Sequence, residues 1–364
     1  MNNDRAWLAT RKGLIELRRQ GGAWSIRRTH FLGEPVSMLL PPDAQGRMLA
    51  ALNLGHFGVK LQASDDAGDH WQEVDAPAYP PQPQSPEGSA GPAWTLQLIW
   101  SLERAGPAER PLIYAGTLPG GLFVSPDHGR HWSLLRGLWD RPERLAWMGG
   151  GYDVPGIHSI CPHPQRPHEL LLGISCGGVW RSEDAGASWA LAAAGMRADF
   201  IPPEQADDPN IQDPHRIVRA PSRPEVLWCQ HHGGIWRSAD NAASWQPLQA
   251  PRSSFGFAVA VHPADADTAW FVPAIKDECR VPVDGALVVN RTTDGGASFQ
   301  TLGEGLPQRD CYDLVYRHGL DVAADGRHLL LASTTGGLWA SADGGEAWTT
   351  VCNTLPMVYA LRFG

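Results

Sequence analysis

The sequence predicts an all-β protein, a seven-bladed β-propeller built from four-stranded antiparallel blades. Three observations support this fold class. An octet recurs along the chain, an apolar Gly-Gly phrase precedes most of its copies, and the composition is rich in turn formers and indoles. The 364 residues include 40 Gly, 31 Pro and 16 Trp. This mixture favours many short strands, tight turns and large side chains between packed sheets.

The octet reads Ser/Thr-x-Asp-x-Gly-x-x-Trp/Phe, and its Asp position recurs every 49 to 61 residues. Five copies match in full, a sixth has Ala242 in place of the Gly, and a seventh keeps only Gly21 and Trp24. The six recognisable copies span 64–71, 125–132, 182–189, 238–245, 292–299 and 341–348. So many matches in one register indicate a structural repeat.

Each repeat also contains two apolar strands joined at Gly-Gly, as in "LLGISCGGVWRS" (171–182), preceded by an apolar run that ends in a turn. A unit therefore has four short strands, with the octet as the hairpin between the third and fourth. This period and unit predict a propeller, here a single domain over 1–364. The first unit lacks its innermost strand, so we expect the C-terminal "MVYALRFG" (357–364) to supply it and close the ring.

The octet resembles the Asp-box, or BNR repeat, of sialidases, sortilin-type receptors, xyloglucanases and photosystem-assembly propellers. The resemblance implies a sialidase-like or glycosyl-hydrolase-like propeller whose boxes lie away from the functional site. The residues favour the same structural role. An Asp carboxylate and a Ser hydroxyl can accept backbone N–H groups within their own turn. The octet lacks the alternating oxygen ligands of a calcium loop.

Charge and targeting signals restrict the partners. A formal net charge of −9 argues against nucleic acid or an anionic membrane surface as the main partner. The start of the chain has no apolar signal region and no window is long enough to span a membrane. The six cysteines form no CxxC pair. Together these features predict a cytoplasmic protein with reduced thiols.

Four long insertions are expected on the face of the propeller opposite the octets, which we call the loop face. They are residues 79–94, 138–156, 196–214 and 275–286. Long loops on a rigid scaffold usually carry function. The repeat register places four imidazoles at this mouth: His56, His158, His215 and His232. Counted from the turns that end the innermost strands, Phe257 and Asp313 occupy the same position as His158 and His215. We predict a site there for one divalent metal, Zn, Fe or Mn. Carboxylates that could orient the rings are available nearby in the sequence: Asp153, Asp207, Asp208 and Asp213. The alternative is that each ring bonds a loop carbonyl or lines a wet channel.

The same mouth should carry groups that hold a substrate. The expected binding residues are Arg11, Lys276, Arg280, Tyr152, His231 and Cys176. Arg280 and Arg11 could grip a carboxylate in the planar geometry of the guanidinium group. Glu278 or Asp313 could then act as general base or acid.

Three functions remain open on the sequence. A sialidase requires an Arg-Ile-Pro type motif, and the corresponding region reads "LATRKGLIEL" (8–17), which disfavours it. A metal-assisted hydrolase or lyase would use the histidines. A non-enzymatic propeller would grip an extended peptide or a protein partner, with Trp139, Trp147 and Tyr152 as an aromatic hot spot. The sequence favours a ligand-binding or hydrolytic site and does not decide whether the protein is an enzyme.

Overall fold

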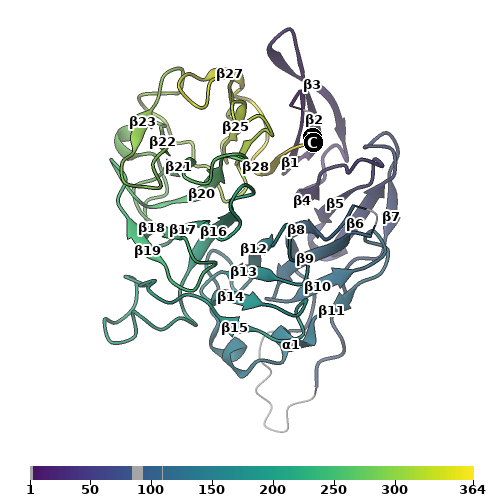
Figure 1. The fold of residues 1–364 in the computed structure, drawn as a ribbon. Helices are drawn as coiled ribbons and strands as arrows, with labels where there is room; N and C mark the ends of the chain where they lie inside the picture. Colours follow the sequence, from purple (N-terminus) through teal and green to yellow (C-terminus); the bar gives the residue numbers. More distant parts are fainter. Residues whose placement is uncertain (1–2, 84–92, 109) are drawn as a thin grey trace.

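The computed structural model describes residues 3–83, 93–108 and 110–364, so most of the insertion predicted at 79–94 lies outside the described residues. The described strands form seven four-stranded antiparallel sheets, which are arranged around a central axis (Figure 1). The sequence prediction of a seven-bladed β-propeller is therefore confirmed.

The blades follow one another along the chain, and each runs from an innermost strand near the axis to an outermost strand. In that order the first has β28 (Val358–Phe363), β1 (Arg5–Thr10), β2 (Gly13–Gln20) and β3 (Ala23–His30). The second has β4 (Val36–Leu40), β5 (Met48–Asn53), β6 (Val59–Ser64) and β7 (Gln72–Val74). The third has β8 (Leu98–Ala105), β9 (Leu112–Leu118), β10 (Leu122–Ser125) and β11 (Ser133–Leu134). The fourth has β12 (Ile157–Pro162), β13 (Leu170–Ile174), β14 (Gly178–Ser182) and β15 (Ala190–Leu191).

The remaining three blades repeat this plan. The fifth has β16 (Pro214–Arg219), β17 (Leu227–His231), β18 (Gly234–Ser238) and β19 (Gln246–Leu248). The sixth has β20 (Gly256–Val261), β21 (Ala269–Pro273), β22 (Val289–Thr292) and β23 (Gln300–Leu302). The seventh has β24 (Leu320–Val322), β25 (Leu329–Ala332), β26 (Leu338–Ser341) and β27 (Thr349–Cys352).

Short helical segments lie in connections on the loop face. They are η1 (Gly55–Phe57), α1 (Arg136–Trp139), η2 (Pro142–Ala146) and η3 (Val283–Gly285). Among the described residues, no helix is both long and apolar enough to cross a membrane. The six described cysteines are all free thiols.

The ring closes as the sequence predicts. Strand β28 pairs antiparallel with β1, and Leu361 lies opposite Leu8 in that ladder. Both leucines are fully buried and belong to one hydrophobic cluster with residues of the seventh blade. The two ends of the chain therefore complete one blade together, which leaves no free inner sheet edge in the first blade.

The octets act as turn stabilisers. In the copy at 341–348, the Ser341 hydroxyl accepts the Gly345 N–H at 2.9 Å and donates to the Asp343 carboxylate at 2.7 Å. In the copy that lacks glycine, Ala242 takes up a positive φ of 64° and its N–H still reaches Ser238 Oγ at 2.9 Å. The turn is thus retained where the sequence pattern is broken.

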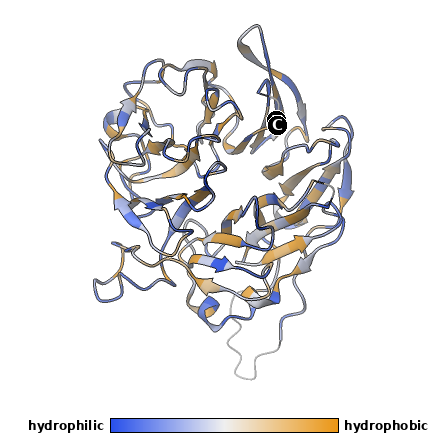
Figure 2. Cartoon of the chain, viewed as in Figure 1, coloured by the Kyte–Doolittle hydropathy of each residue, from blue (hydrophilic) through white to orange (hydrophobic). Residues whose placement is uncertain are grey.

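Hydrophobic side chains fill the spaces between adjacent blades. The inner and middle strands are almost entirely buried, as in β12 and β13, whereas outer strands such as β7 and β19 are largely exposed. Many residues of the blade strands are hydrophobic (Figure 2). Because each blade buries its neighbour's face, the inner strands are held rigidly and can position side chains at the mouth.

One position of the innermost strand recurs around the mouth in every blade. In the fifth blade Ile217 pairs with Cys229, and His215 lies two residues before Ile217. In every other blade we find the pair of residues equivalent to Ile217 and Cys229 and count two residues back along the innermost strand. This gives the seven residues that we call the mouth ring: Ser37, Trp100, His158, His215, Phe257, His318 and Tyr359.

The mouth ring corrects the sequence alignment of the seventh blade. There Leu320 pairs with Leu331, which pairs with Trp339, just as Cys229 pairs with Trp236 in the fifth blade. The residue equivalent to His215 is therefore His318, whereas the sequence alignment chose Asp313. The error arose because the segment before β24 carries extra residues outside the ladder, so its turn glycine is not equivalent to the turn prolines of other blades.

Candidate functional site

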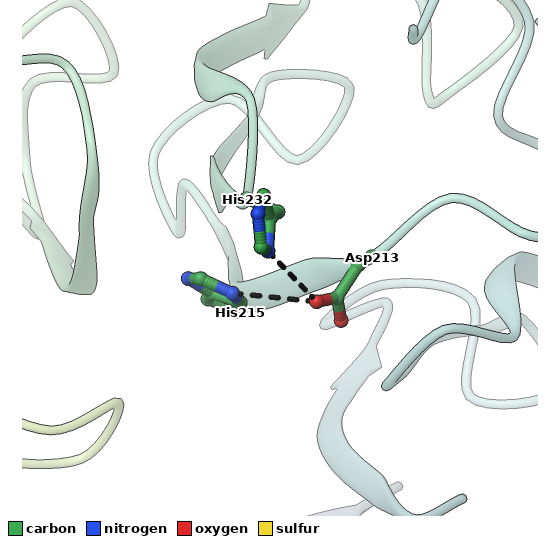
Figure 3. A group of neighbouring side chains, drawn as sticks. All are labelled: Asp213, His215 and His232. Atoms are coloured by element: carbon green, nitrogen blue, oxygen red, sulfur yellow. Dashed lines mark ion pairs between the residues drawn. The ribbon is translucent and has the colours of Figure 1, made fainter. Parts of the chain in front are cut away.

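Three side chains meet at the start of the fifth blade's inner strand (Figure 3). Asp213 directly precedes β16, His215 lies within it, and His232 follows β17. The same carboxylate oxygen, Asp213 Oδ2, lies 3.4 Å from His215 Nε2 and 3.5 Å from His232 Nδ1. One ligand atom from each of the three residues lies within 4.8 Å of the others. We call this group the Asp–His–His cluster.

The surroundings of His215 fix its tautomer. Its Nδ1 lies 2.6 Å from the carbonyl oxygen of Gly256, and a carbonyl can only accept. Nδ1 must therefore carry the proton, which leaves the lone pair of a neutral ring on Nε2, facing Asp213. The ring is also stacked on Phe257 with centroids 4.4 Å apart. A backbone carbonyl behind a histidine is the arrangement that commonly orients a metal ligand.

Asp213 is held by backbone groups on its other side. The Cys176 N–H donates to Asp213 Oδ1 at 3.1 Å, and Cys176 has a positive φ of 42°. Gly150 packs so closely here that a Cβ would lie 3.1 Å from Asp213 Oδ1. The carboxylate is thus buried, oriented and free to present Oδ2 to the two imidazoles.

Charges within the cluster perturb one another. Burial alone would raise the pKa of Asp213, but its contact with His232 and the charge of Arg317 hold it well below its usual value. Burial lowers the pKa of His215, which Asp213 only partly opposes. Burial also acts against a charged His232, yet the bond and charge of Asp213 raise the pKa of that ring.

The cluster forms one wall of a cavity of about 270 Å³, which we call the histidine cavity. Phe200, Asp277 and Glu278 line it as well. A second cavity of about 410 Å³, the central cavity, lies beside it and shares Gly151, Arg280 and Arg317 with it. Together they have the size of a small-molecule site at the mouth of the propeller.

The four predicted metal ligands do not all come together. His215 and His232 join the cluster, with ring centroids 5.6 Å apart. His56 lies on η1 and is exposed, with its ring tilted against that of Phe57. His158 belongs to the mouth ring but is fully buried, with Nδ1 2.9 Å from Ser159 Oγ. The third member of the cluster is therefore Asp213, and the predicted ligands His56 and His158 do not belong to it.

The two predicted acid–base residues lie in different cavities. Glu278 lines the histidine cavity with its side chain 76% exposed, 3.5 Å from Lys276. Asp313 lines a separate cavity and accepts hydrogen bonds from Ser333 and Thr335. The structure therefore does not bring them together as a catalytic pair, because Asp313 is not in the mouth ring.

The predicted binding residues are divided between the cavities and the rim. Arg280 lines both cavities and pairs with Asp277 at 2.5 Å, and Tyr152 lines the central cavity. Arg11 and Lys276 are exposed on the loop face.

Cys176 and His231 are buried beside the Asp–His–His cluster, and Cys176 also lines the histidine cavity. The Asp213 N–H lies 3.1 Å from His231 Nε2. Burial raises the pKa of the Cys176 thiol and lowers that of His231 to about 3, so neither ionises near neutral pH. His231 supports the cluster from behind through the backbone of Asp213, and Cys176 holds the Asp213 carboxylate through its own N–H.

The prediction of an exposed aromatic hot spot was wrong for two of its three residues. Trp139 and Trp147 are 1% and 6% exposed, and the Trp147 indole N–H donates to Asn210 at 3.0 Å. Only Tyr152 is exposed, at 46%. The loop before the fourth blade folds its tryptophans inward because they fill the space against Trp180 and Tyr79.

Sequence reasoning missed two residues. Asp213 was predicted only as a carboxylate near the histidines, although the spacing Asp-Pro-His places it beside His215 at the strand start. Arg317 was missed because of the register error in the seventh blade. It adjoins His318 of the mouth ring, and counting from the Trp339 ladder would have found it.

Comparisons with known proteins support the fold. No family model matches the chain. A xyloglucanase from Paenibacillus sp is 23% identical over 278 residues, which are 67% of this chain and 25% of that protein. This chain thus spans about a quarter of the length of the curated relative it matches.

Comparison with solved structures also supports the propeller fold. An ancestral GH74 enzyme superposes with a TM-score of 0.59 at 14% identity, covering 92% of this chain and 37% of that one. YCF48 bound to D1 peptide gives 0.56 at 13% identity, covering 99% and 88%. A chain of the mitotic checkpoint complex gives 0.55 at 12% identity, covering 96% and 88%. The chain is a seven-bladed β-propeller whose fold is similar to that of GH74 enzymes and of YCF48.

Proposed function

We propose that the loop face carries a metal-dependent ligand-binding site with hydrolytic activity, and that Asp213, His215 and His232 hold one divalent ion. The observation that supports this proposal is that two hydrogen-bond acceptors, His215 Nε2 and Asp213 Oδ2, face each other. The lone pair of a neutral His215 faces an ionised Asp213 oxygen at 3.4 Å, and His232 approaches the same oxygen. A cation between them removes that repulsion.

The donor set limits the metal. Two imidazoles and one carboxylate are typical of catalytic zinc and of non-haem iron sites, which keep coordination positions open for water or substrate. A bound ion of this kind would supply Lewis-acid catalysis and a more acidic water. The chain's own contribution is to orient the three ligands through Gly256 and Cys176 and to place Arg280 and Arg317 beside them.

The reaction class follows from this arrangement. In hydrolysis, water adds to a carbonyl or phosphoryl centre, the bond to the leaving group breaks, and the leaving group takes up a proton. The xyloglucanase relative makes a glycan the alternative substrate. A glycosidase needs two cooperating carboxylates, however, and Glu278 and Asp313 line different cavities. The geometry therefore favours the histidine cluster.

The test is metal binding by protein purified without a histidine tag. We expect about one equivalent of Zn²⁺, Fe²⁺ or Mn²⁺ by elemental analysis after incubation with each ion and desalting. Replacing a ligand should cost metal affinity steeply, so calorimetry on His232→Ala should show at least a tenfold weaker Kd. His56→Ala is the matched control, since that ring is on the same face outside the cluster, and its Kd should be unchanged.

Two results would contradict the proposal. One is less than a tenth of an equivalent of any of the three ions bound to the wild-type protein. The other is equal affinity in His232→Ala and wild type. If metal binds, hydrolysis of aryl esters and aryl phosphates should be lost on chelation and restored on adding the ion back.

A second candidate function is recognition of an extended peptide. Nine large hydrophobic side chains are exposed among the described residues, and eight of them are in connections that open on the loop face: Leu32, Phe57, Leu145, Met148, Tyr152, Phe200, Ile275 and Tyr312. Such a concentration on one face is typical of interaction sites. The similarly folded YCF48 is seen bound to D1 peptide.

A peptide-display selection tests this candidate. Peptides enriched on wild-type protein should lose binding to a Leu145→Ser, Tyr312→Ser double variant. The control, Ile26→Ser, changes the ninth of these described residues, which lies in an outer strand, β3, and should bind as wild type does. Failure to enrich any sequence would argue against the peptide role.

A further inference from the structure

Arg317 is a buried cation without a counter-ion in contact. Arg317 is 8% exposed, and its Nε atom is buried with no hydrogen-bond partner. Among the described residues, no carboxylate lies within 4.0 Å of its guanidinium nitrogens, and its one hydrogen bond is to the Gly150 carbonyl at 3.5 Å. A buried, unpaired charge is strongly unfavourable. Such a group points to a ligand that would neutralise it.

The neighbours of Arg317 do not neutralise it. The guanidinium lies 4.8 Å from the Trp100 ring centroid and 5.4 Å from that of Phe257, which are cation–π distances. Asp213 is the carboxylate whose charge most favours the charged form of Arg317. Its oxygens lie more than 4.0 Å from the guanidinium nitrogens, however, and Asp213 already contacts two histidines. The positive charge of Arg317 also helps to keep His158 and His318 neutral, by lowering their pKa values beyond the effect of burial.

Arg317 faces a binding space on both sides. It lines the histidine cavity and the central cavity, so it stands at the junction of the two. Arg280 lines both as well, but it is already paired with Asp277 at 2.5 Å. An anion entering the junction would therefore find Arg317 as a guanidinium without a carboxylate partner in contact.

The central cavity has aromatic walls. Trp100, Tyr152, Tyr316 and Tyr359 line it, and the rings of Trp100 and Tyr152 meet edge to face with centroids 5.0 Å apart. Burial raises the pKa values of Tyr152 and Tyr359, so these phenols stay neutral beside an anion. Rings of this kind bind a flat aromatic group through offset and edge contacts.

The polar lining fits a sugar less well. Ser37 and Asn53 are the polar, uncharged non-aromatic side chains along this cavity among the described residues. The Ser37 hydroxyl already lies 3.1 Å from the Ile99 carbonyl and 3.3 Å from that of Ala51. The other hydrogen-bonding groups of this lining include the hydroxyls of Tyr152, Tyr316 and Tyr359, which lie at the edges of aromatic rings, so a flat aromatic ligand suits the cavity better than one with hydroxyls on every side.

We propose that Arg317 anchors the oxyanion of a flat aromatic ligand whose ring lies in the central cavity. The carboxylate or phosphate would sit at the junction, beside the Asp–His–His cluster, and the ring would lie against Trp100 and Tyr152. This inference deepens the proposed function by naming the ligand class. It rests on the loop-face cavities as the binding site and does not require the metal.

Calorimetry with small probes tests the inference. Benzoate and phenyl phosphate carry the ring and the oxyanion, benzamide carries the ring alone, acetate the charge alone, and glucuronate a sugar ring with a carboxylate. Wild-type protein should bind benzoate or phenyl phosphate at least tenfold more tightly than benzamide, acetate or glucuronate. The stronger of the two aromatic anions identifies the oxyanion.

Variants assign the effect to Arg317. In Arg317→Met the aromatic anion should bind at least tenfold more weakly, while Arg309→Met, an exposed arginine on the same face, should bind as wild type does. Tyr152→Ala should weaken benzoate and leave acetate unchanged. If Arg317→Met does not fold, as judged by circular dichroism, Arg317→Lys and the comparison of charged with neutral probes in wild type decide the matter.

The outcomes separate this inference from the metal proposal. Equal affinities for benzoate and benzamide, tighter binding of glucuronate, or undiminished binding in a folded Arg317 variant would overturn it. Each titration is repeated after chelation and in His232→Ala. Retained benzoate binding there, with metal binding absent from the wild type, would overturn the metal site and leave the anion site standing.

Discussion

Ser341 illustrates how a single hydroxyl stabilises an octet turn. Its residue is 3% exposed, and its oxygen accepts the N–H groups of Gly345 and Asp343 while it donates to the Asp343 carboxylate. The same pattern recurs at Ser64, Ser125 and Ser182. The octet carboxylates are therefore bonded within their own turns, in keeping with a structural role for this repeat.

Replacing Ser341 by Ala should destabilise the protein by about 1–2 kcal/mol, because a buried N–H loses its acceptor. The free energy of unfolding from urea denaturation is the measurement. Ser222→Ala serves as the control, since Ser222 is exposed in the turn between β16 and β17, and it should stay within about 0.5 kcal/mol of wild type. A Ser341 variant as stable as the control would show that the turn is held by its backbone alone.

Neighbouring blades are joined near the octets by polar contacts as well as by apolar packing. Glu169, just before β13 of the fourth blade, accepts a hydrogen bond from Arg166 at 2.8 Å and one from Asn241 of the fifth blade's octet at 2.5 Å. Its side chain is 5% exposed. Burial alone would raise the pKa of Glu169, but the bonds from Arg166 and Asn241 lower it to about 2.

The stabilisation from Glu169 should depend on pH. Because its pKa is lower in the folded protein than in the unfolded chain, its contribution is complete above about pH 5 and is lost as the pH falls toward 2. At about 1.4 kcal/mol per pKa unit, Glu169→Gln should lose roughly 2–3 kcal/mol at pH 7. The difference from wild type should shrink in urea titrations at pH 4 and pH 3.

Glu183→Gln provides the comparison for that experiment. Its side chain is 69% exposed in an ion pair with Arg181, so the change should be small at every pH. A Glu169 variant whose deficit is the same at pH 3 and pH 7 would mean that shape, and not the ionised carboxylate, joins the two blades.

The blade pattern was predictable from sequence because each unit repeats the same local chemistry. Gly-Gly, the apolar strands and the octet mark the second and third strands of most blades, and counting along the repeats placed His158, His215 and Phe257 correctly in the mouth ring. The method failed in the seventh blade, where residues before β24 lie outside the ladder and no repeat pattern marks them. That failure exchanged His318 for Asp313 and hid Arg317.

The candidate site was predictable only as a region. Repeat register gives the direction from which a side chain approaches the mouth, but not its depth or partner. Asp213 gains its place from the Cys176 N–H, and His158 is withdrawn from the cavity by its bond with Ser159. Such contacts depend on loop conformations that a single sequence does not specify.

At the scale of the whole molecule, the mouth geometry depends on ring closure. All seven mouth-ring residues lie in or near innermost strands. The first blade contributes a residue to the mouth ring only because β28 returns to pair with β1. Tyr359, which lines the central cavity, is contributed by that last strand. The aromatic wall of the proposed anion site therefore requires the chain's final segment to be docked.

Weakening the closing strand should open the first blade selectively. Leu361 is fully buried opposite Leu8, so Leu361→Ala should cost about 2–5 kcal/mol and speed hydrogen exchange of the β1 amides. Leu331→Ala is the matched control, because Leu331 is equally buried in β25, and its loss should destabilise the protein without favouring exchange in β1. Mass spectrometry of exchanged peptides from residues 3–20 makes the comparison. Equal protection of β1 in the two variants would mean that the blades open as one cooperative unit, with no weak point at the seam where the two termini meet.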